Sequence, residues 1–188
     1  MIKALFKFDR NIPKDAMVVD TTNNTSPIWK WISPFILPAP PAKNLENLWQ
    51  FSKVYKHHIG SDGLPNEEWY KWRIAGFADP KAHRYPMGKG RKPEYSFWNG
   101  EKLGYISARK EIYIPEYIKN VVSTGSFKLL AETYTACQNH GKLLVLLDYD
   151  AYDHQALGMS LKDVVNNPDR IMGHSFVLLG LLTGEPLV

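Results

Sequence analysis

The stretch "NLENLWQFSKVYKHH", residues 44–58, combines the spacing of an amphipathic helix with a row of chemically active side chains. Asn44 stands where a helix N-cap would, and Gly60 with the following "SDGLP" would end the helix. The i, i+3, i+4, i+7 spacing that predicts this helix runs through Leu45, Leu48, Trp49, Ser52 and Tyr55. The preceding "SPFILPAPPAK" contains four prolines, so it is expected to be extended or turned and to deliver the chain into the helix.

Three polar side chains in this stretch, Glu46, Gln50 and Lys53, fall close to one face of the expected helix. One interpretation is a solvent-facing ion pair of small energetic value. However, apolar residues cover most of the remaining circumference, and a helix of that kind tends to be buried. Polar groups on a buried helix need partners or a cleft to face. A buried ion pair and an active site therefore both remain open on these residues alone.

The chain as a whole is that of one folded domain. It has 188 residues, of which 44% are hydrophobic and 22% charged, values typical of a globular protein. The single Cys137 excludes an internal disulfide and a cysteine-rich zinc site, and scattered histidines make any metal site unexpected. No run is apolar enough for a signal peptide or a membrane span, so we expect a cytoplasmic protein without membrane contact.

Helical patterns dominate the rest of the sequence, which predicts a mainly α fold with at most short strands. Residues 66–79 read as a second helix, and residues 80–110 as a long loop without helical or strand period. Two more helices are expected at 114–125 and 126–141. Residues 142–152 could be a buried strand or a helix, and Asn167 with Pro168 predicts the start of a final helix.

Positive charge is concentrated in the middle of the chain. Residues 71–110 hold ten Lys and Arg against three Asp and Glu, whereas residues 111–188 hold five against nine. Such a segment indicates either a phosphate-bearing partner or a solvated basic face without a specific ligand. The Walker, GxGxxG, HExxH and GxSxG motifs are absent, and no cofactor is expected.

Three carboxylates, Asp148, Asp150 and Asp153, gather in "DYDAYD". They could bind a divalent cation, orient a sugar hydroxyl, or cap and solvate a loop. The calcium-loop pattern is incomplete, since the glycine and the terminal acidic residue are missing at the required offsets.

Residues 31–55, "WISPFILPAPPAKNLENLWQFSKVY", resemble the first signature of the NADAR superfamily, an SxF turn followed by an E-x-x-x-Q-x-x-K helix. Ser33, Phe35, Glu46, Gln50 and Lys53 occupy the matching places. Two further segments are similar to later family motifs, "RYPMGKGRKP" and "DAYD" followed by "DRIMGHSFVLLGLL". Asp153 stands where the family has tryptophan, and Asn47 where it often has histidine, which is typical of a divergent branch such as one carried by phages.

The resemblance implies a compact, mostly helical domain, with a core at residues 31–182 behind an N-terminal extension at 1–30. It also implies hydrolysis of an N-glycosidic bond in a ribosylamine or in ADP-ribose attached to guanine of nucleic acid. Glu46 would stabilise positive charge on the ribose or activate water, Lys53 could attack the opened sugar, and Asp150 would position hydroxyls. Substrate-binding roles would fall to Gln50, Trp49, Ser33, Phe35, Arg84, Lys89, Arg91, Lys92, Trp98 and Tyr152.

Two non-enzymatic functions remain as alternatives. The chain could bind nucleotides or nucleic acid without catalysis, through the basic segment at residues 71–110. It could also be an interaction module, for example a phage protein that blocks a host factor, with a vestigial pocket. An open cavity shared by Glu46 and Lys53 would favour the enzyme, and a pocket filled by side chains would favour the interaction module.

Overall fold

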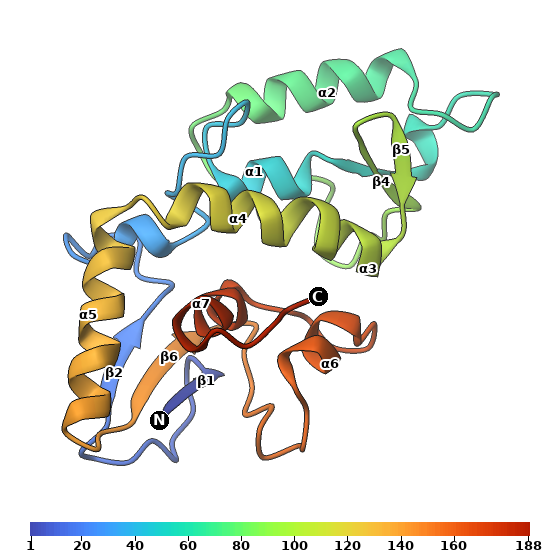
Figure 1. The fold of residues 1–188 in the computed structure, drawn as a ribbon. Helices are drawn as coiled ribbons and strands as arrows, with labels where there is room; N and C mark the ends of the chain where they lie inside the picture. The colour runs from blue at the N-terminus through green and yellow to red at the C-terminus, as the bar shows by residue number, and fades with distance from the viewer. The chain divides into compact units, whose positions relative to one another are not determined.

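The computed structural model describes all 188 residues, which form two compact units (Figure 1). The first unit contains Met1–Ser33 and Tyr117–Val188, and the second contains Pro34–Glu116. Helices account for 38% of the chain and strands for 14%, in both parallel and antiparallel sheets. The expectation of a mainly α fold is therefore wrong, and the fold is mixed α/β. The prediction that the chain is a single domain stays a prediction.

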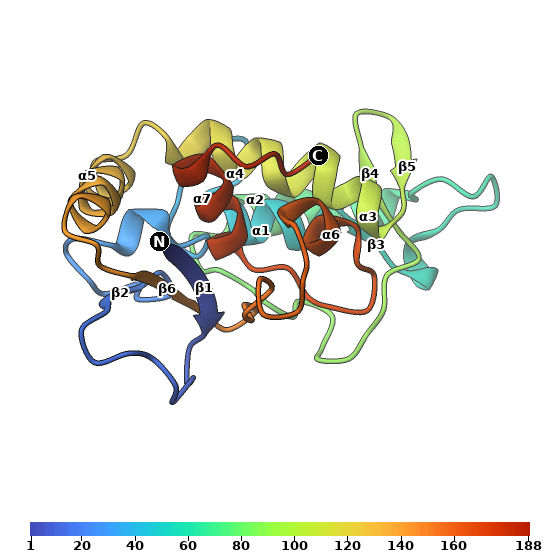
Figure 2. The ribbon, with the colours of Figure 1, turned by 60° about the horizontal axis from the view of Figure 1, so that its bottom comes forward.

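A parallel sheet of three short strands forms the centre of the first unit. Its order is β1 (Ile2–Phe6), β6 (Leu144–Asp148) and β2 (Met17–Asp20), as the ribbon in Figure 2 shows. Both outer strands pair with β6, Ile2 and Met17 each lying opposite Leu144. The leucine-rich β6 is almost wholly buried, as a central parallel strand should be. Residues 1–30 thus supply two of the three strands of this sheet.

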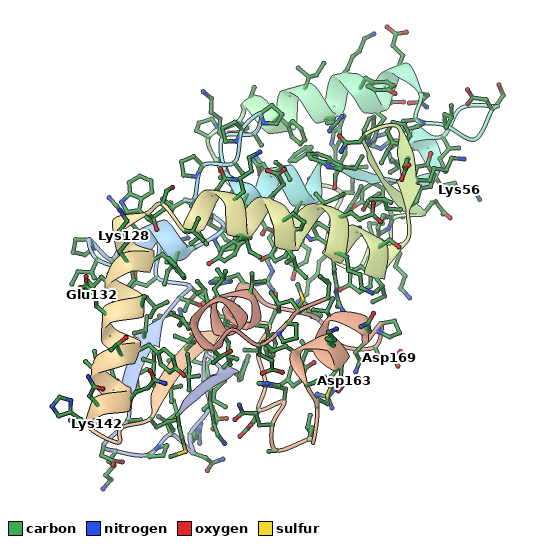
Figure 3. All side chains as sticks on the ribbon, viewed as in Figure 1. Lys56, Lys128, Glu132, Lys142, Asp163 and Asp169 are labelled. Carbon is green, nitrogen blue, oxygen red and sulfur yellow. The ribbon has the colours of Figure 1, made fainter.

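Helices α5 and α7 are the longest helices of the first unit. Helix α7 packs against β1 and β6 and is buried over most of its length, which explains its almost entirely apolar sequence. Helix α5 begins after Thr124, whose hydroxyl accepts from the Phe127 amide, and its exposed Lys128 and Glu132 are labelled in Figure 3. The helical elements that lie wholly in this unit are the 3-10 helix η1 (Lys30–Ile32), α5 (Gly125–Asn139), α6 (Leu161–Asn166) and α7 (His174–Thr183).

Helix α7 begins later than the sequence predicted. Asn167 instead follows the end of α6, and its side chain accepts from the Asp169 amide in a turn. The helix starts after Gly173, and its first-turn amide of Ser175 donates to Asp148 Oδ2 at 3.1 Å. A carboxylate at the end of β6 therefore supplies the cap that the sequence pattern assigned to Asn167.

An antiparallel sheet of three strands, β3 (Lys53–Val54), β4 (Tyr95–Trp98) and β5 (Glu101–Leu103), lies in the second unit. Strands β4 and β5 form a hairpin in which Trp98 pairs with Glu101. The two turn residues, Asn99 and Gly100, both have positive φ, as a tight hairpin turn requires. Residues 80–110 therefore do not form a loop without secondary structure, as predicted, since they include this hairpin and the start of a helical segment.

Helix α1 (Leu45–Gln50) begins as expected, with the Asn44 side chain accepting from the Asn47 amide. It ends much earlier than predicted, after Gln50, because the chain turns into strand pairing with β4. The amide of Phe97 donates to the Ser52 carbonyl at 2.8 Å, and the indole of Trp69 donates to the Lys53 carbonyl at 2.9 Å. These contacts outweigh the helical preference of the sequence.

The other helices of the second unit agree better with the sequence. Helix α2 is capped by Asn66, whose side chain accepts from the Trp69 amide, as predicted. A continuous helical run joins α3, the π-helix η3 and α4, which extends beyond the second unit. The bounds of the helical elements after α1 are η2, a 3-10 helix (Lys56–His58), α2 (Glu67–Ala78), α3 (Tyr105–Ala108), η3 (Arg109–Tyr113) and α4 (Ile114–Val121). None of the helices in the chain has the length and apolar character needed to cross a membrane.

Gly76 of α2 marks the closest approach of this helix to Phe51. A Cβ atom at Gly76 would lie 2.1 Å from Phe51 Cδ1, and the Phe51 ring is itself buried. We expect Gly76→Ala to lower the free energy of unfolding by about 1–3 kcal/mol, because the added methyl forces the ring to move. Denaturant unfolding would measure this loss. Gly125→Ala is the matched control, since nothing lies within 4 Å of the added Cβ, and unchanged stability in both variants would contradict the close packing.

Candidate functional site

A chain of hydrogen bonds links three of the predicted site residues in the second unit. Gln50 Nε2 donates to Glu46 Oε1 at 2.9 Å, and Lys53 Nζ donates to Gln50 Oε1 at 2.7 Å. Glu46 and Gln50 are one turn apart on α1, whereas Lys53 lies on β3 and its side chain returns to the helix. The three side chains meet, but Lys53 is not part of the helix on which the sequence pattern placed it, and the role of these residues as a site stays a prediction.

Two aromatic rings lie beside this chain. Lys53 Nζ lies 4.9 Å from the centroid of the Trp49 ring, and Tyr113 meets that ring edge to face at 5.3 Å. Glu46 and Gln50 are 7% and 8% exposed, so water reaches little of either side chain. A carboxylate, an amide and an amine thus form one polar chain in largely apolar surroundings, where electrostatic interactions are stronger than in water.

Lys53 has an unusual acidity for a lysine. Burial lowers the pKa of its amine from 10.5 to about 8, and the attraction of Glu46 opposes part of that change. At neutral pH the amine is therefore still mostly an ammonium that can donate a proton. A modest rise in pH converts it to the neutral, nucleophilic form.

This pKa can be tested by dimethylating the lysines with labelled formaldehyde and following the Lys53 methyl signal by NMR against pH. We expect a midpoint near pH 8 for Lys53. In Glu46→Gln the midpoint should fall further, because the substitution removes the negative charge that raises the pKa. A midpoint near the ordinary lysine value in the wild type, or an unchanged midpoint in the variant, would contradict the described environment.

Several other predicted site residues also belong to the second unit. Phe35 is half-buried and precedes α1. Trp98 is on β4, with its ring 5.4 Å from the Arg73 guanidinium. The predicted phosphate ligands lie between α2 and β4: Arg84 is half-buried with its guanidinium 5.5 Å from the Tyr85 ring, and Lys89, Arg91 and Lys92 are exposed.

Ser33, Asp150 and Tyr152 belong to the first unit. The Ser33 hydroxyl donates to Asn24 Oδ1 at 2.6 Å. The amide of Asp150 donates to Asp148 Oδ1, and its carbonyl accepts from Gly173, while Tyr152 packs against the Phe176 ring. The convergence of Asp150 with Glu46 and Lys53 stays a prediction.

The sequence reasoning did not anticipate the buried ion pair of Asp148 and His174 in the first unit. Their side chains are 3.0 Å apart, and His174 Nε2 also contacts the Thr21 carbonyl at 3.0 Å. Burial opposes both charges, yet the attraction between the partners lowers the pKa of Asp148 far below its usual value and raises that of His174. The position of Asp148 at the end of an apolar run was the available sequence signal.

The carboxylates of "DYDAYD" therefore do not act as one cluster. Asp148 pairs with His174, whereas Asp153 forms an ion pair with Lys3 at 2.6 Å. No group of three or more His, Cys, Asp or Glu side chains in the chain is arranged to hold a metal ion.

Comparisons with protein-family models, with curated proteins and with solved structures find no match to this chain. The functional assignment therefore depends on the chemistry of the side chains described above.

Proposed function

We propose that the protein is an N-glycoside hydrolase that cleaves the bond between a ribose or ADP-ribose and a base, for example in ADP-ribosylated guanine of nucleic acid. The hydrogen-bonded chain of Glu46, Gln50 and Lys53 carries this proposal. It supplies a carboxylate and a weakly acidic ammonium, which are both hydrogen-bonded to the amide between them and are largely buried. The resemblance to the NADAR signature provides the reaction class.

Glu46 is the group suited to the ribose. When the N-glycosidic bond breaks, its electron pair goes to the base, and positive charge develops on the sugar. A carboxylate in largely apolar surroundings stabilises that charge and accepts a proton from the water that adds to the anomeric carbon. The hydrogen bond from Gln50 fixes the orientation of one carboxylate oxygen.

Lys53 is the group suited to the departing base. Its pKa of about 8 leaves it protonated at neutral pH, yet acidic enough to give a proton to the base nitrogen as the bond breaks. Its neutral form could then recover the proton that Glu46 took from water, which returns both groups to their starting states. The half-buried ring of Trp49 offers a surface for stacking against the base, and the buried Tyr113 packs against that ring.

The direct test is to incubate the protein with guanine-ADP-ribosylated DNA, similarly modified RNA and small ribosides, and to measure release of the sugar. We expect turnover of at least one of these N-glycosides. A lack of turnover across all three substrates would remove the proposal. Trapping with borohydride distinguishes the two roles considered for Lys53, since only amine attack on the opened sugar leaves an adduct on its side chain.

Nucleotide binding without catalysis is the second candidate function. The exposed cations Lys89, Arg91 and Lys92 favour it, since each lies within two residues of Gly90, a glycine with positive φ. Such binding would weaken with salt and with charge reversal at these three positions. A protein that only binds nucleotides would release no detectable ADP-ribose. A hydrolase would show both the salt-dependent binding and the release of ADP-ribose.

A further inference from the structure

Arg73 of α2 is enclosed by aromatic rings in an unusual way. Its guanidinium lies 5.1 Å from the Trp69 ring, 4.8 Å from the Phe77 ring and 5.4 Å from the Trp98 ring. Trp69 and Phe77 are a turn before and a turn after Arg73 on the same helix, and Trp98 comes from β4. Trp69 and Phe77 are both buried, so the rings hold the guanidinium in a defined position.

No carboxylate neutralises this guanidinium. Arg73 is half-buried, and its Nε atom is buried without a hydrogen-bond partner. Burial lowers the pKa of Arg73, and the only charge interaction that opposes this comes from Tyr70. Ring contacts offset part of the desolvation of a cation, but a buried donor without a partner still costs about 1–3 kcal/mol. Fully buried arginines are normally paired with an acid, and the half-buried Arg73 forms no ion pair that would compensate its partial desolvation.

We propose that Arg73 is an anion-binding residue that receives a phosphate group of a nucleotide or nucleic-acid ligand. The planar guanidinium presents donors that match two phosphate oxygens, and the rings fix it in advance of binding. The charge of the segment that contains Arg73 favours phosphate over a lone carboxylate, since residues 71–110, Arg73 included, carry ten cationic against three acidic side chains. A bound phosphate would also supply the missing counter-charge.

This site is distinct from the basic residues predicted from sequence. Lys89, Arg91 and Lys92 are exposed and suit non-specific attraction. Arg73 is half-buried among three rings, and the ring of Trp69 connects it to the candidate active site, because the indole donates to the Lys53 carbonyl. The aromatic enclosure therefore identifies Arg73, which charge counting alone does not distinguish from its neighbours.

The test uses the Nε–H signal of Arg73 in a nitrogen-15 NMR spectrum of the full-length protein. Inorganic phosphate is added at constant ionic strength, with sodium chloride as the reference titration. We expect a saturable shift of the Arg73 signal with phosphate and no shift with chloride. Absence of a saturable shift with phosphate would overturn the proposal, whatever the behaviour of any variant.

Two ligands then identify the source of the phosphate. ADP-ribose and a single-stranded oligonucleotide without terminal phosphates are compared by the same signal, and the ligand that saturates at lower concentration is the better match. Arg73→Lys keeps the charge but loses the planar guanidinium, so we expect the affinity for the ligand to fall by about tenfold or more. Arg10→Met, at an exposed arginine of the first unit, is the matched control for Arg73→Met.

Equal affinity of Arg73→Met and Arg10→Met for the better ligand, measured by isothermal titration calorimetry because Arg73→Met lacks the Nε–H group, would also overturn the proposal. Circular dichroism of each variant verifies that the fold is retained before affinities are compared. Phosphate binding at Arg73 does not require hydrolysis, so a negative result here and a negative turnover assay are distinguishable.

Discussion

Replacement of Asp148 by asparagine is expected to lower the free energy of unfolding by about 3–5 kcal/mol near pH 6, because it leaves the buried, protonated His174 without its counter-charge. Asparagine keeps the size of the side chain and can still accept from the Ser175 amide, so the loss reports mainly on the charge. Urea unfolding of the wild type and the variant across a range of pH measures the difference.

The pH dependence of this loss follows from the two pKa shifts. The folded pKa of His174 is above its ordinary value of 6.5, so its contribution is complete below that pH and is lost as pH rises through the folded pKa. The folded pKa of Asp148 is below its ordinary value of 3.8, so its contribution is present above that pH and is lost on acidification. The destabilisation should therefore be greatest between these two values and shrink at alkaline pH.

Asp153→Asn is the matched control for this prediction. Asp153 forms its ion pair with Lys3 where the two side chains are 28% and 35% exposed. Solvent screens such a pair, and we expect a loss of about 1 kcal/mol or less. A similar loss in both variants, or a loss at Asp148 that does not change with pH, would show that the buried pair is not charged as described.

The sequence predicted the starts of α1 and α2 because their signals are local. Asn44 and Asn66 each lie directly before a helix and accept from an amide three residues later. The end of α1 could not be found in this way. It depends on pairing between Lys53 and Ser96, which are far apart in the chain, and periodicity within a short window carries no information about such a contact.

The hairpin of β4 and β5 differs from the end of α1, because the sequence does contain a local signal for it. Asn-Gly directly after the aromatic-rich run "YSFW" is an indicator of a tight hairpin. The segment "YSFWNGEKL" predicts this hairpin, although the mixed fold class depends also on the parallel sheet. The parallel sheet was harder to predict, since β1 and β6 are separated by most of the chain.

The candidate site was predictable to the extent that its residues are close in sequence. Glu46, Gln50 and Lys53 lie within eight positions, so either a helix or a helix followed by a turn brings them together. Arg73 was not identifiable, because its significance comes from Trp98 on a distant strand and from the absence of an acidic partner.

Glu46→Gln is expected to reduce turnover of the N-glycoside by about 10²–10⁴-fold, which is the usual contribution of a single acid–base or electrostatic group. The substitution removes the negative charge while keeping an oxygen that can accept from Gln50 Nε2, so the chain of hydrogen bonds can persist. Single-turnover release of the sugar with enzyme in saturating excess over substrate, measured with purified variant and wild type, gives the ratio directly.

Glu67→Gln is the matched control, because Glu67 also lies in the first turn of a helix but forms an exposed ion pair with Lys71. Its turnover should equal that of the wild type. Equal turnover in Glu46→Gln would remove Glu46 from the mechanism and leave its hydrogen bond as a structural contact. The dependence of turnover on pH adds a second criterion. Loss of the Glu46 charge should move the decline in turnover that follows deprotonation of Lys53 to lower pH. A purely structural defect would not produce this change.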